Sequence, residues 1–249
     1  MSEKNHLINC KFIAALLVAT ICTVIAGAVN PYPTLKAKAE RFFDHQEWAS
    51  AAAMFDLMLE EHPDTPRTYG QAIVANGMLG ETTGQNRLMA MALDNHIPFD
   101  SVFSNVKEWS FHIGQPTLFE NFLKDTRTAH PWMRRTIDGQ LLKYYSFRRN
   151  GAEMIAYSNI MLAGAPDNIG FLSQLGEGYM LTGATAQGID IYKKILSLHP
   201  DNYNALIVLG NWYAQHPENG DNALTYLQRA DSLRPTPYVT ALINKLKRR

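Results

Sequence analysis

Histidines are the side chains of this 249-residue chain that could most readily act as bases or metal ligands. Three of the eight, His62, His130 and His199, each precede a proline and are 68 and 69 residues apart. Packed helices lie about 8–10 Å apart, so residues two helical hairpins apart are separated by at least ~20 Å. Zinc bonds to nitrogen are about 2 Å long. The spacing therefore predicts equivalent turn positions and no shared metal ion.

Other motifs that would indicate catalysis are absent from the sequence. It contains no Gly-Lys-Ser/Thr phosphate loop, no His-Glu-x-x-His and no Gly-x-Ser-x-Gly. The glycines around Glu177 have the wrong spacing for a dinucleotide loop, and Glu60-Glu61 is typical of a solvated helix end. Both cysteines, Cys10 and Cys22, lie in the first 22 residues, which excludes a disulfide framework or a cysteine-ligated metal in the rest. We expect no enzyme activity, no cofactor and no metal.

The charge balance bears on the class of partner. Lys and Arg number 23, as do Asp and Glu, so the formal net charge is zero. A nucleic-acid-binding protein usually carries a surplus of basic residues, so nucleic acid is not an expected partner. Hydrophobic residues make up 46% of the chain, enough to bury a sizeable core.

The N-terminal segment has the order of an export signal. Lys4 and Lys11 precede an apolar run over residues 12–29, which contains the small triplet Ala26-Gly27-Ala28. This order predicts either a signal peptide, residues 1–28, cleaved after Ala28, or an uncleaved membrane anchor formed by residues 12–29. Residues 29–33 are expected to be a linker. The protein is therefore expected to be exported, and to contact a membrane only through residues 12–29.

A period of 33 to 35 residues organises the chain from residue 34 to residue 235. Six prolines mark the ends of six units, and they are Pro63, Pro98, Pro131, Pro166, Pro200 and Pro235. Each unit contains two segments with the 3–4 apolar spacing of a helix face. Proline ends the second segment because it lacks an N–H and clashes with the preceding turn. Asp201, which follows Pro200, is expected to cap the next helix.

Residues 236–249 predict one further helix. Thr236 can cap it with Pro237 in its first turn, and Val239, Leu242, Ile243 and Leu246 form one apolar stripe. This helix should cover the exposed face of the last unit. Its end is basic.

Each unit also shares a residue pattern with a known family. The fifth unit shows it most fully, with Leu175, Gly176, Tyr179, Gly183, Gly188, Tyr192, Leu196 and Pro200. This pattern resembles the tetratricopeptide repeat (TPR). The resemblance implies an all-α, right-handed solenoid of about six helical hairpins and a capping helix, in which Gly176 approaches Gly188. The second and third units match less well, and Glu120 occupies a position where a small residue is expected.

The resemblance also implies a binding surface. In this family the first helices of the hairpins line a concave groove for a protein or an extended peptide. The matching positions of the fourth to sixth units are Lys143, Phe147, Ser173, Glu177, Asn204, Asn211 and Gln215. Asn211 is similar to the asparagine of members that clamp the C-terminal carboxylate of chaperones. Ile207 stands where their lysine would be, which argues against that subclass.

The function expected from the resemblance is a non-enzymatic binding scaffold of the cell envelope. A second expectation is an envelope-assembly helper similar to the anchored repeat proteins of cytochrome c maturation. Two further functions are compatible with a solenoid, and these are a structural spacer in a surface complex and an enzyme that uses the solenoid cleft.

Overall fold

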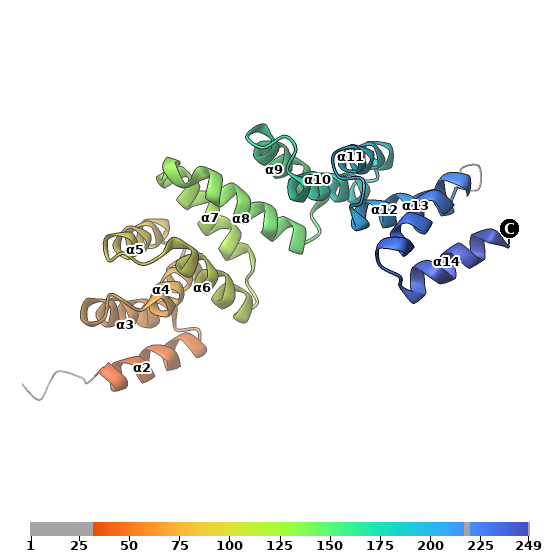
Figure 1. Ribbon diagram of the computed structural model, residues 1–249. Helices are drawn as coiled ribbons and strands as arrows, with labels where there is room; N and C mark the ends of the chain where they lie inside the picture. The colour runs from red at the N-terminus through yellow and green to blue at the C-terminus, as the bar shows by residue number, and fades with distance from the viewer. Residues whose placement is uncertain (1–31, 217–219, 249) are drawn as a thin grey trace, which may run out of the picture. The chain divides into compact units, whose positions relative to one another are not determined.

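The computed structural model describes residues 32–216 and 220–248, and every regular element within these ranges is helical (Figure 1). The expected signal or anchor, residues 1–28, lies outside the described part. Among the helices that are described, none is long and apolar enough to cross a membrane. The first begins at Tyr32, so the last two residues of the expected linker are helical. Pro33 is compatible with this, because a proline is tolerated in the first turn of a helix.

The described helices follow one another as six hairpins and a final single helix, which confirms the expected architecture. Their bounds are α2 (Tyr32–Asp44), α3 (Trp48–Glu61), α4 (Pro66–Leu79), α5 (Thr82–Asp94), α6 (Phe99–His112), α7 (Thr117–Ala129), the 3-10 helix η1 (Pro131–Met133), α8 (Arg134–Phe147), α9 (Gly151–Ala163), α10 (Ile169–Leu181), α11 (Thr185–Leu198), α12 (Tyr203–Ala214), α13 (Gly220–Leu233) and α14 (Pro237–Lys247). They form two compact units, one up to Asp125 and one from Thr126 onward.

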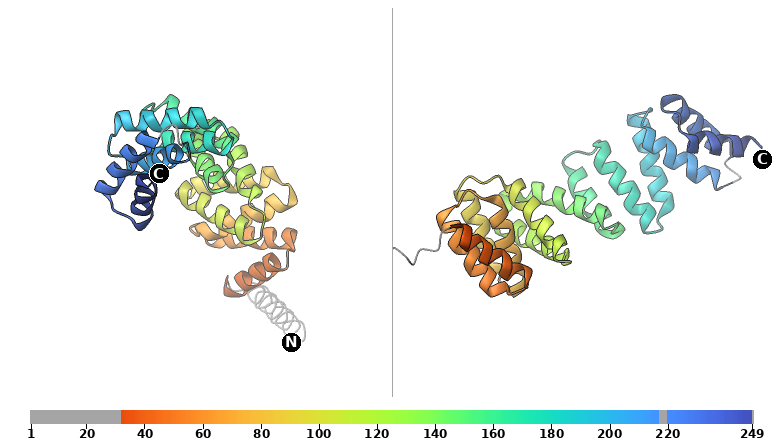
Figure 2. Two further views of the ribbon diagram at one scale, coloured as in Figure 1. Left: turned by 90° about the vertical axis from the view of Figure 1, so that its right-hand side faces the viewer. Right: turned by 90° about the horizontal axis from the view of Figure 1, so that it is seen from below.

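In the first unit, helix α3 packs against α2 and α4, and α4 packs against α5 and α6. Figure 2 shows these helices side by side from two further directions. Aromatic rings pack within and between the hairpins. The ring centroid of Phe43 on α2 lies 5.9 Å from that of Phe55 on α3 of the same hairpin, and 5.4 Å from that of Trp109 on α6. Neither hairpin could bury these rings alone, so stacking of neighbours supplies the stability.

In the second unit, helix α9 packs against α8 and α10, α12 packs against α11 and α13, and α13 packs against α14. One core cluster joins the last two hairpins, and its largest buried members are Leu172, Ile189, Tyr192, Ile195, Leu209 and Tyr213. Consecutive helices are neighbours here, as α3 is of α2 and α4 in the first unit.

The predicted close approach at Gly176 and Gly188 is confirmed. A Cβ at Gly188 would lie 3.1 Å from the carbonyl oxygen of Gly176, and a Cβ at Gly176 would lie 3.0 Å from the ring of Tyr192. Helices α10 and α11 can approach this closely because neither position carries a side chain. The register assigned to the fifth unit is therefore right.

The expected capping role of Asp201 is wrong. The N-cap of α12 is Asn202, whose side chain accepts a hydrogen bond from the N–H of Ala205 at 2.9 Å. The helix begins at Tyr203, so the residue directly before it is the one placed to reach the free N–H groups. Asp201 instead lies 2.9 Å from a guanidinium nitrogen of Arg229 on α13, which ties the loop to the second helix of the same hairpin.

The third hairpin forms although Glu120 takes the place of a small residue. Helix α7 buries Phe119, Phe122 and Leu123, while Glu120 stays at the edge and pairs with Lys124 at 2.7 Å, one turn along the same helix. A glutamate is thus accommodated there because its carboxylate reaches the surface.

The capping helix is confirmed in detail. The side chain of Thr236 accepts a hydrogen bond from the N–H of Val239 at 3.3 Å. Val239 and Ile243 are buried against Leu227 of α13. Helix α14 therefore covers the last hairpin with its apolar stripe, as its sequence predicts.

Candidate partner-binding site

A hollow of about 310 Å³ opens between α12 and α14, and we call it the end pocket. Both helices belong to the second unit. The residues that line it are Asn211, Ala214 and Gln215 from α12 and Tyr238, Leu242, Lys245 and Leu246 from α14. Two of the seven residues predicted to line the groove, Asn211 and Gln215, are therefore brought together here.

The end pocket has an apolar floor and a polar rim. Ala214 is buried, and Leu242 and Leu246 are half-buried. On the rim, the hydroxyl of Tyr238 donates a hydrogen bond to Oδ1 of Asn211 at 2.8 Å. The Nδ2 of Asn211 is a second hydrogen-bonding group of this amide and can donate to a ligand. Lys245 is exposed and adds a positive charge. This arrangement suits an apolar group that carries hydrogen-bonding or anionic groups beside it.

Five of the lining residues were missed by sequence reasoning, and they are Ala214 on α12 and the four residues on α14. The sequence does contain a signal for those on α14. Tyr238 follows Tyr203 by 35 residues, the same separation as between Pro200 and Pro235. Helix α14 therefore takes the position of the first helix of a further repeat, and first helices are the ones predicted to line the groove.

The other predicted groove residues lie elsewhere on the second unit. Lys143 and Phe147 are exposed on α8, where Phe147 is 66% accessible, and Asn204 is exposed in the first turn of α12. Ser173 and Glu177 are half-buried on α10. The end pocket contains none of these five residues, and their role in binding stays a prediction.

Ser173 and Glu177 both lie near Tyr192 of α11. The Tyr192 hydroxyl donates a long hydrogen bond, 3.5 Å, to the backbone carbonyl of Ser173. Burial, and to a lesser degree the negative charge of Glu177, raises the pKa of Tyr192 to about 12. Glu177 also lies 3.5 Å from a guanidinium nitrogen of Arg149.

We expect the raised pKa of Tyr192 to make stability fall at high pH. An unfolded tyrosine ionises near pH ~10, whereas the folded Tyr192 retains its proton up to about pH 12. Between these values the unfolded state loses a proton that the folded state keeps, so the free energy of unfolding decreases as the pH rises. The expected loss is about 1.4 kcal/mol by pH ~11. Denaturant unfolding of the wild type and of Tyr192→Phe across this range checks it, and parallel pH profiles would contradict it.

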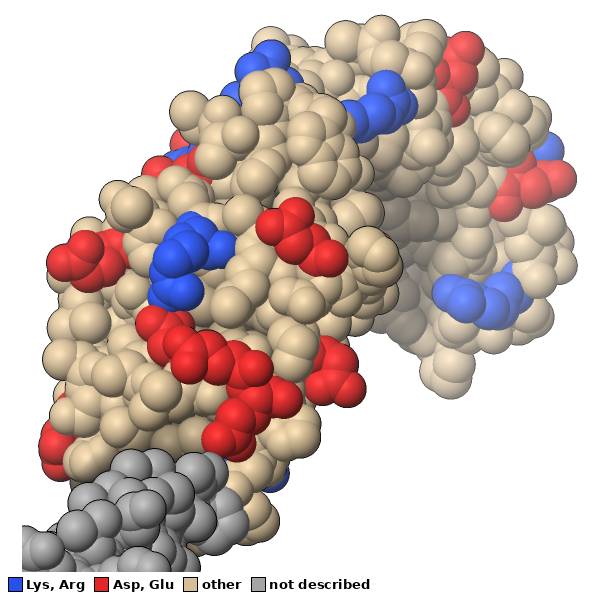
Figure 3. Space-filling model, turned by 90° about the vertical axis from the view of Figure 1, so that its left-hand side faces the viewer, with Lys and Arg blue, Asp and Glu red and all other residues tan. Residues whose placement is uncertain are grey.

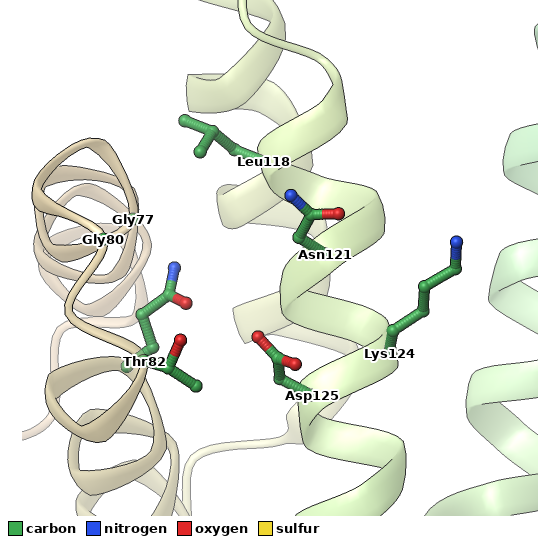
Figure 4. Close-up of a pocket in the computed structure, with 8 residues that line it drawn as sticks. Gly77, Gly80, Thr82, Leu118, Asn121, Lys124 and Asp125 are labelled. Atoms are coloured by element: carbon green, nitrogen blue, oxygen red, sulfur yellow. The ribbon is translucent and has the colours of Figure 1, made fainter.

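A second hollow, of about 250 Å³, lies in the first unit. Figure 4 shows Asn121 and Asp125 projecting from α7 on the side that faces α5, where Thr82 begins that helix. Gly77 and Gly80 line the α4 side, where Gly77 packs closely against Gln85 and Leu118. The lining combines polar side chains such as Asn121, Lys124 and Asp125 with the apolar Leu118. Among the residues that the structure describes, no group of three His, Cys, Asp or Glu could hold a metal ion.

A third hollow, of about 270 Å³, lies between the second helices of the last two hairpins. Helix α11 contributes Lys193 and Leu196, and α13 contributes Tyr226 and Arg229. This hollow is lined mainly by second helices, so it is the alternative to the end pocket as a position where a partner could dock.

Comparisons with known proteins concern the fold. No protein-family model matches the chain, and no curated protein matches it. Among solved structures, the C-terminal part of a TPR repeat-containing protein from Cytophaga hutchinsonii is 16% identical, with a TM-score of 0.47 over 78% of this chain and 77% of that chain. A protein from Bacteroides ovatus described as protein-binding is 16% identical, with a TM-score of 0.46 over 74% and 97% of the two chains. PilF of Pseudomonas aeruginosa is 13% identical, with a TM-score of 0.44 over 87% and 96%.

The hairpins themselves define the type of fold. Each consists of two helices of 12 to 14 residues, and prolines 33 to 35 residues apart follow their second helices. Glycines allow the helices of the fifth and sixth hairpins to pack closely. The described part of the chain is thus a series of helical hairpins with the repeat length and the close helix packing that the resemblance to TPR predicts.

Proposed function

We propose that this TPR chain is a non-enzymatic scaffold that binds a protein or an extended peptide along the first helices of its second unit. The end pocket carries the proposal, because it combines an apolar floor with a rim of amide, hydroxyl and ammonium groups. Its residues lie on α12, the first helix of the last hairpin, and on α14, which takes the position of the first helix of a further repeat.

The chemistry of an extended peptide matches this pocket. Such a peptide has backbone N–H and C=O groups that are free to bond, and its alternate side chains point in opposite directions. Asn211 and Gln215 each offer a donor and an acceptor. Because Tyr238 occupies the oxygen of Asn211, the Nδ2 of Asn211 is the group left to donate to a peptide carbonyl, while an apolar side chain enters the pocket.

The test is a selection of peptides from a random displayed library against the full chain, followed by affinity measurements on variants. We expect Asn211→Ala to weaken the selected peptides up to about tenfold, since one neutral hydrogen bond contributes roughly 0.5–1.5 kcal/mol. Gln228→Ala is the matched control, because Gln228 is an exposed amide on α13 that lies outside the three hollows. It should leave affinity unchanged.

Arg229→Ala distinguishes the two docking positions on the second unit. Arg229 lines the hollow between α11 and α13, so this variant reports on the second helices. A loss in Arg229→Ala equal to or larger than that in Asn211→Ala would place the binding surface there and contradict the proposal. Circular dichroism should show that each variant is folded.

We also propose that the protein acts outside the cytoplasm. The order of basic residues, apolar run and Ala26-Gly27-Ala28 supports this proposal. The mass of the intact protein recovered from its native cells is expected to correspond to a chain that starts at Val29. A full-length chain in the membrane pellet would indicate the anchor instead, and a full-length soluble chain would contradict both forms of export.

A further inference from the structure

We propose that the end pocket also binds a second copy of this chain, whose helix α3 inserts Leu57 between α12 and α14. This inference rests on the proposed function only in using the same pocket as a docking position. It assigns a specific occupant to that pocket and predicts head-to-tail self-association.

The end pocket has features that suit an acidic helix with an exposed leucine. Leu242, Leu246 and Ala214 supply an apolar floor. Lys245 stands at the rim, and within the described residues it forms no ion pair. Lys247 and Arg248 follow it, also exposed. A partner that places an apolar side chain in the pocket and carboxylates one turn away would satisfy both features.

Helix α3 presents this combination. Leu57 is 44% exposed, which is unusual for so large an apolar side chain in the first unit. Glu60 and Glu61 lie three and four residues further along, so they share its face of the helix. Both are exposed, and neither has an ion-pair partner among the described residues. The other exposed leucine of this unit, Leu79, lacks acids at these two positions.

The charges of the two units support this pairing. Residues 32–125 contain seven basic and thirteen acidic side chains, a net charge of −6, whereas residues 126–249 contain fourteen and nine, a net charge of +5. Figure 3 shows acidic side chains gathered in a run on one face of the first unit. The zero net charge of the whole chain hides this asymmetry. Opposite charges on two copies attract over distances comparable to the Debye length, ~10 Å at 0.1 M salt.

The two surfaces differ and lie on different units, so the contact is heterologous. Each copy retains a free pocket on its second unit and a free α3 on its first unit, and such contacts extend into open assemblies unless the rotation closes a ring. The assembly should therefore grow with protein concentration and stop when either surface is blocked.

Sedimentation velocity of the full chain in non-ionic detergent tests the association. We expect the sedimentation coefficient to rise with protein concentration at about 0.01 M salt, and to rise much less at about 1 M salt, where the Debye length is ~3 Å. Lys245→Glu alone and Glu60→Lys/Glu61→Lys alone should each stay monomeric. The matched controls, Lys247→Glu for the pocket and Asp44→Lys/Glu47→Lys for the first hairpin, should associate more than the two interface variants.

Mixing the two interface variants gives the decisive result. The Lys245→Glu chain retains an intact α3, and the Glu60→Lys/Glu61→Lys chain retains an intact pocket, so together they form one native contact. We expect a discrete one-to-one dimer that does not grow further. Leu57→Ser in the first of these chains should abolish that dimer.

Three outcomes would overturn the inference: a monomer at every concentration, association that survives both charge reversals, or no dimer on mixing. The failure of this inference and that of the proposed function can be distinguished. The Glu60→Lys/Glu61→Lys chain has an unchanged second unit, so it should still bind the selected peptides with wild-type affinity even if copies of the chain never associate.

Discussion

Replacing Arg127 by alanine is expected to lower the free energy of unfolding by about 3 kcal/mol. The Nε of Arg127 donates to Oδ1 of Asp138 at 2.6 Å, and a second guanidinium nitrogen donates to Oδ2 at 3.3 Å. The Asp138 side chain is only 3% exposed, and that of Arg127 is 31% exposed. Hydrogen bonding to Asp138 raises the pKa of Arg127 above its usual value. Without the guanidinium, Asp138 would be a buried charge with no counterion, and such losses amount to about 3–5 kcal/mol.

A second arginine–aspartate ion pair, which is more exposed, provides the control. Arg87 donates to both carboxylate oxygens of Asp56 at 2.8 Å, but these side chains are 50% and 37% exposed. Water screens this pair, so Arg87→Ala should change stability by less than about 1 kcal/mol. Midpoints of denaturant unfolding compare the two variants. Equal losses would show that burial of Asp138 is not the cause.

A third variant distinguishes the effect of leaving the Asp138 carboxylate without a counterion from the effect of losing the packing of the Arg127 side chain. Arg127→Ala/Asp138→Asn removes the arginine and the charge it neutralises. It should be more stable than Arg127→Ala alone, because a neutral amide is less costly to bury than a carboxylate. If the double variant is less stable still, the loss comes from side-chain contacts and not from an unpaired charge.

The hairpins could be predicted because the information for them is local. Pro200 and Pro235 end helices through their own backbone chemistry, and the apolar spacing of a segment such as Phe171–Leu181 needs no knowledge of distant residues. Where two neighbouring residues offered the same function, this reasoning failed. Asp201 and Asn202 can both cap a helix, and only the helix start at Tyr203 shows that Asn202 does so.

The end pocket could be predicted only in part. The family resemblance identified Asn211 and Gln215, but the partner helix was interpreted as a cover for the core. The hydrogen bond between Tyr238 and Asn211 joins residues 27 positions apart, so no helical periodicity reports it. The pair of Arg127 and Asp138 is a similar case, since nothing in the sequence shows that Asp138 is buried.

Adding a leucine side chain at Gly151 is expected to destabilise the second unit by about 3 kcal/mol. Gly151 begins α9, where a Cβ would lie 2.9 Å from the carbonyl oxygen of Gly178 on α10 and equally close to side-chain carbons of Leu181 and Thr182. A Cβ at Gly178 would in turn lie 3.1 Å from the carbonyl oxygen of Gly151. The two backbones therefore touch, and backbone atoms cannot rotate aside as a flexible side chain can. Overpacking of this kind typically costs about 1–3 kcal/mol and occasionally more.

Gly139→Ala is the matched control, since it also adds carbon to a helical glycine of the same hairpin. A Cβ at Gly139 would meet only the terminal carbon of Met161, at 3.7 Å, which is an ordinary contact. Gly139 lies in the interior of α8, where alanine is favoured over glycine by up to ~1 kcal/mol. The two substitutions should therefore move the denaturant midpoint in opposite directions, Gly139→Ala upward and Gly151→Leu downward. If the denaturant midpoint of Gly151→Leu does not fall, α9 and α10 must pack further apart than the contact of Gly151 with Gly178 requires. The close packing at glycines would then not extend to that pair of helices.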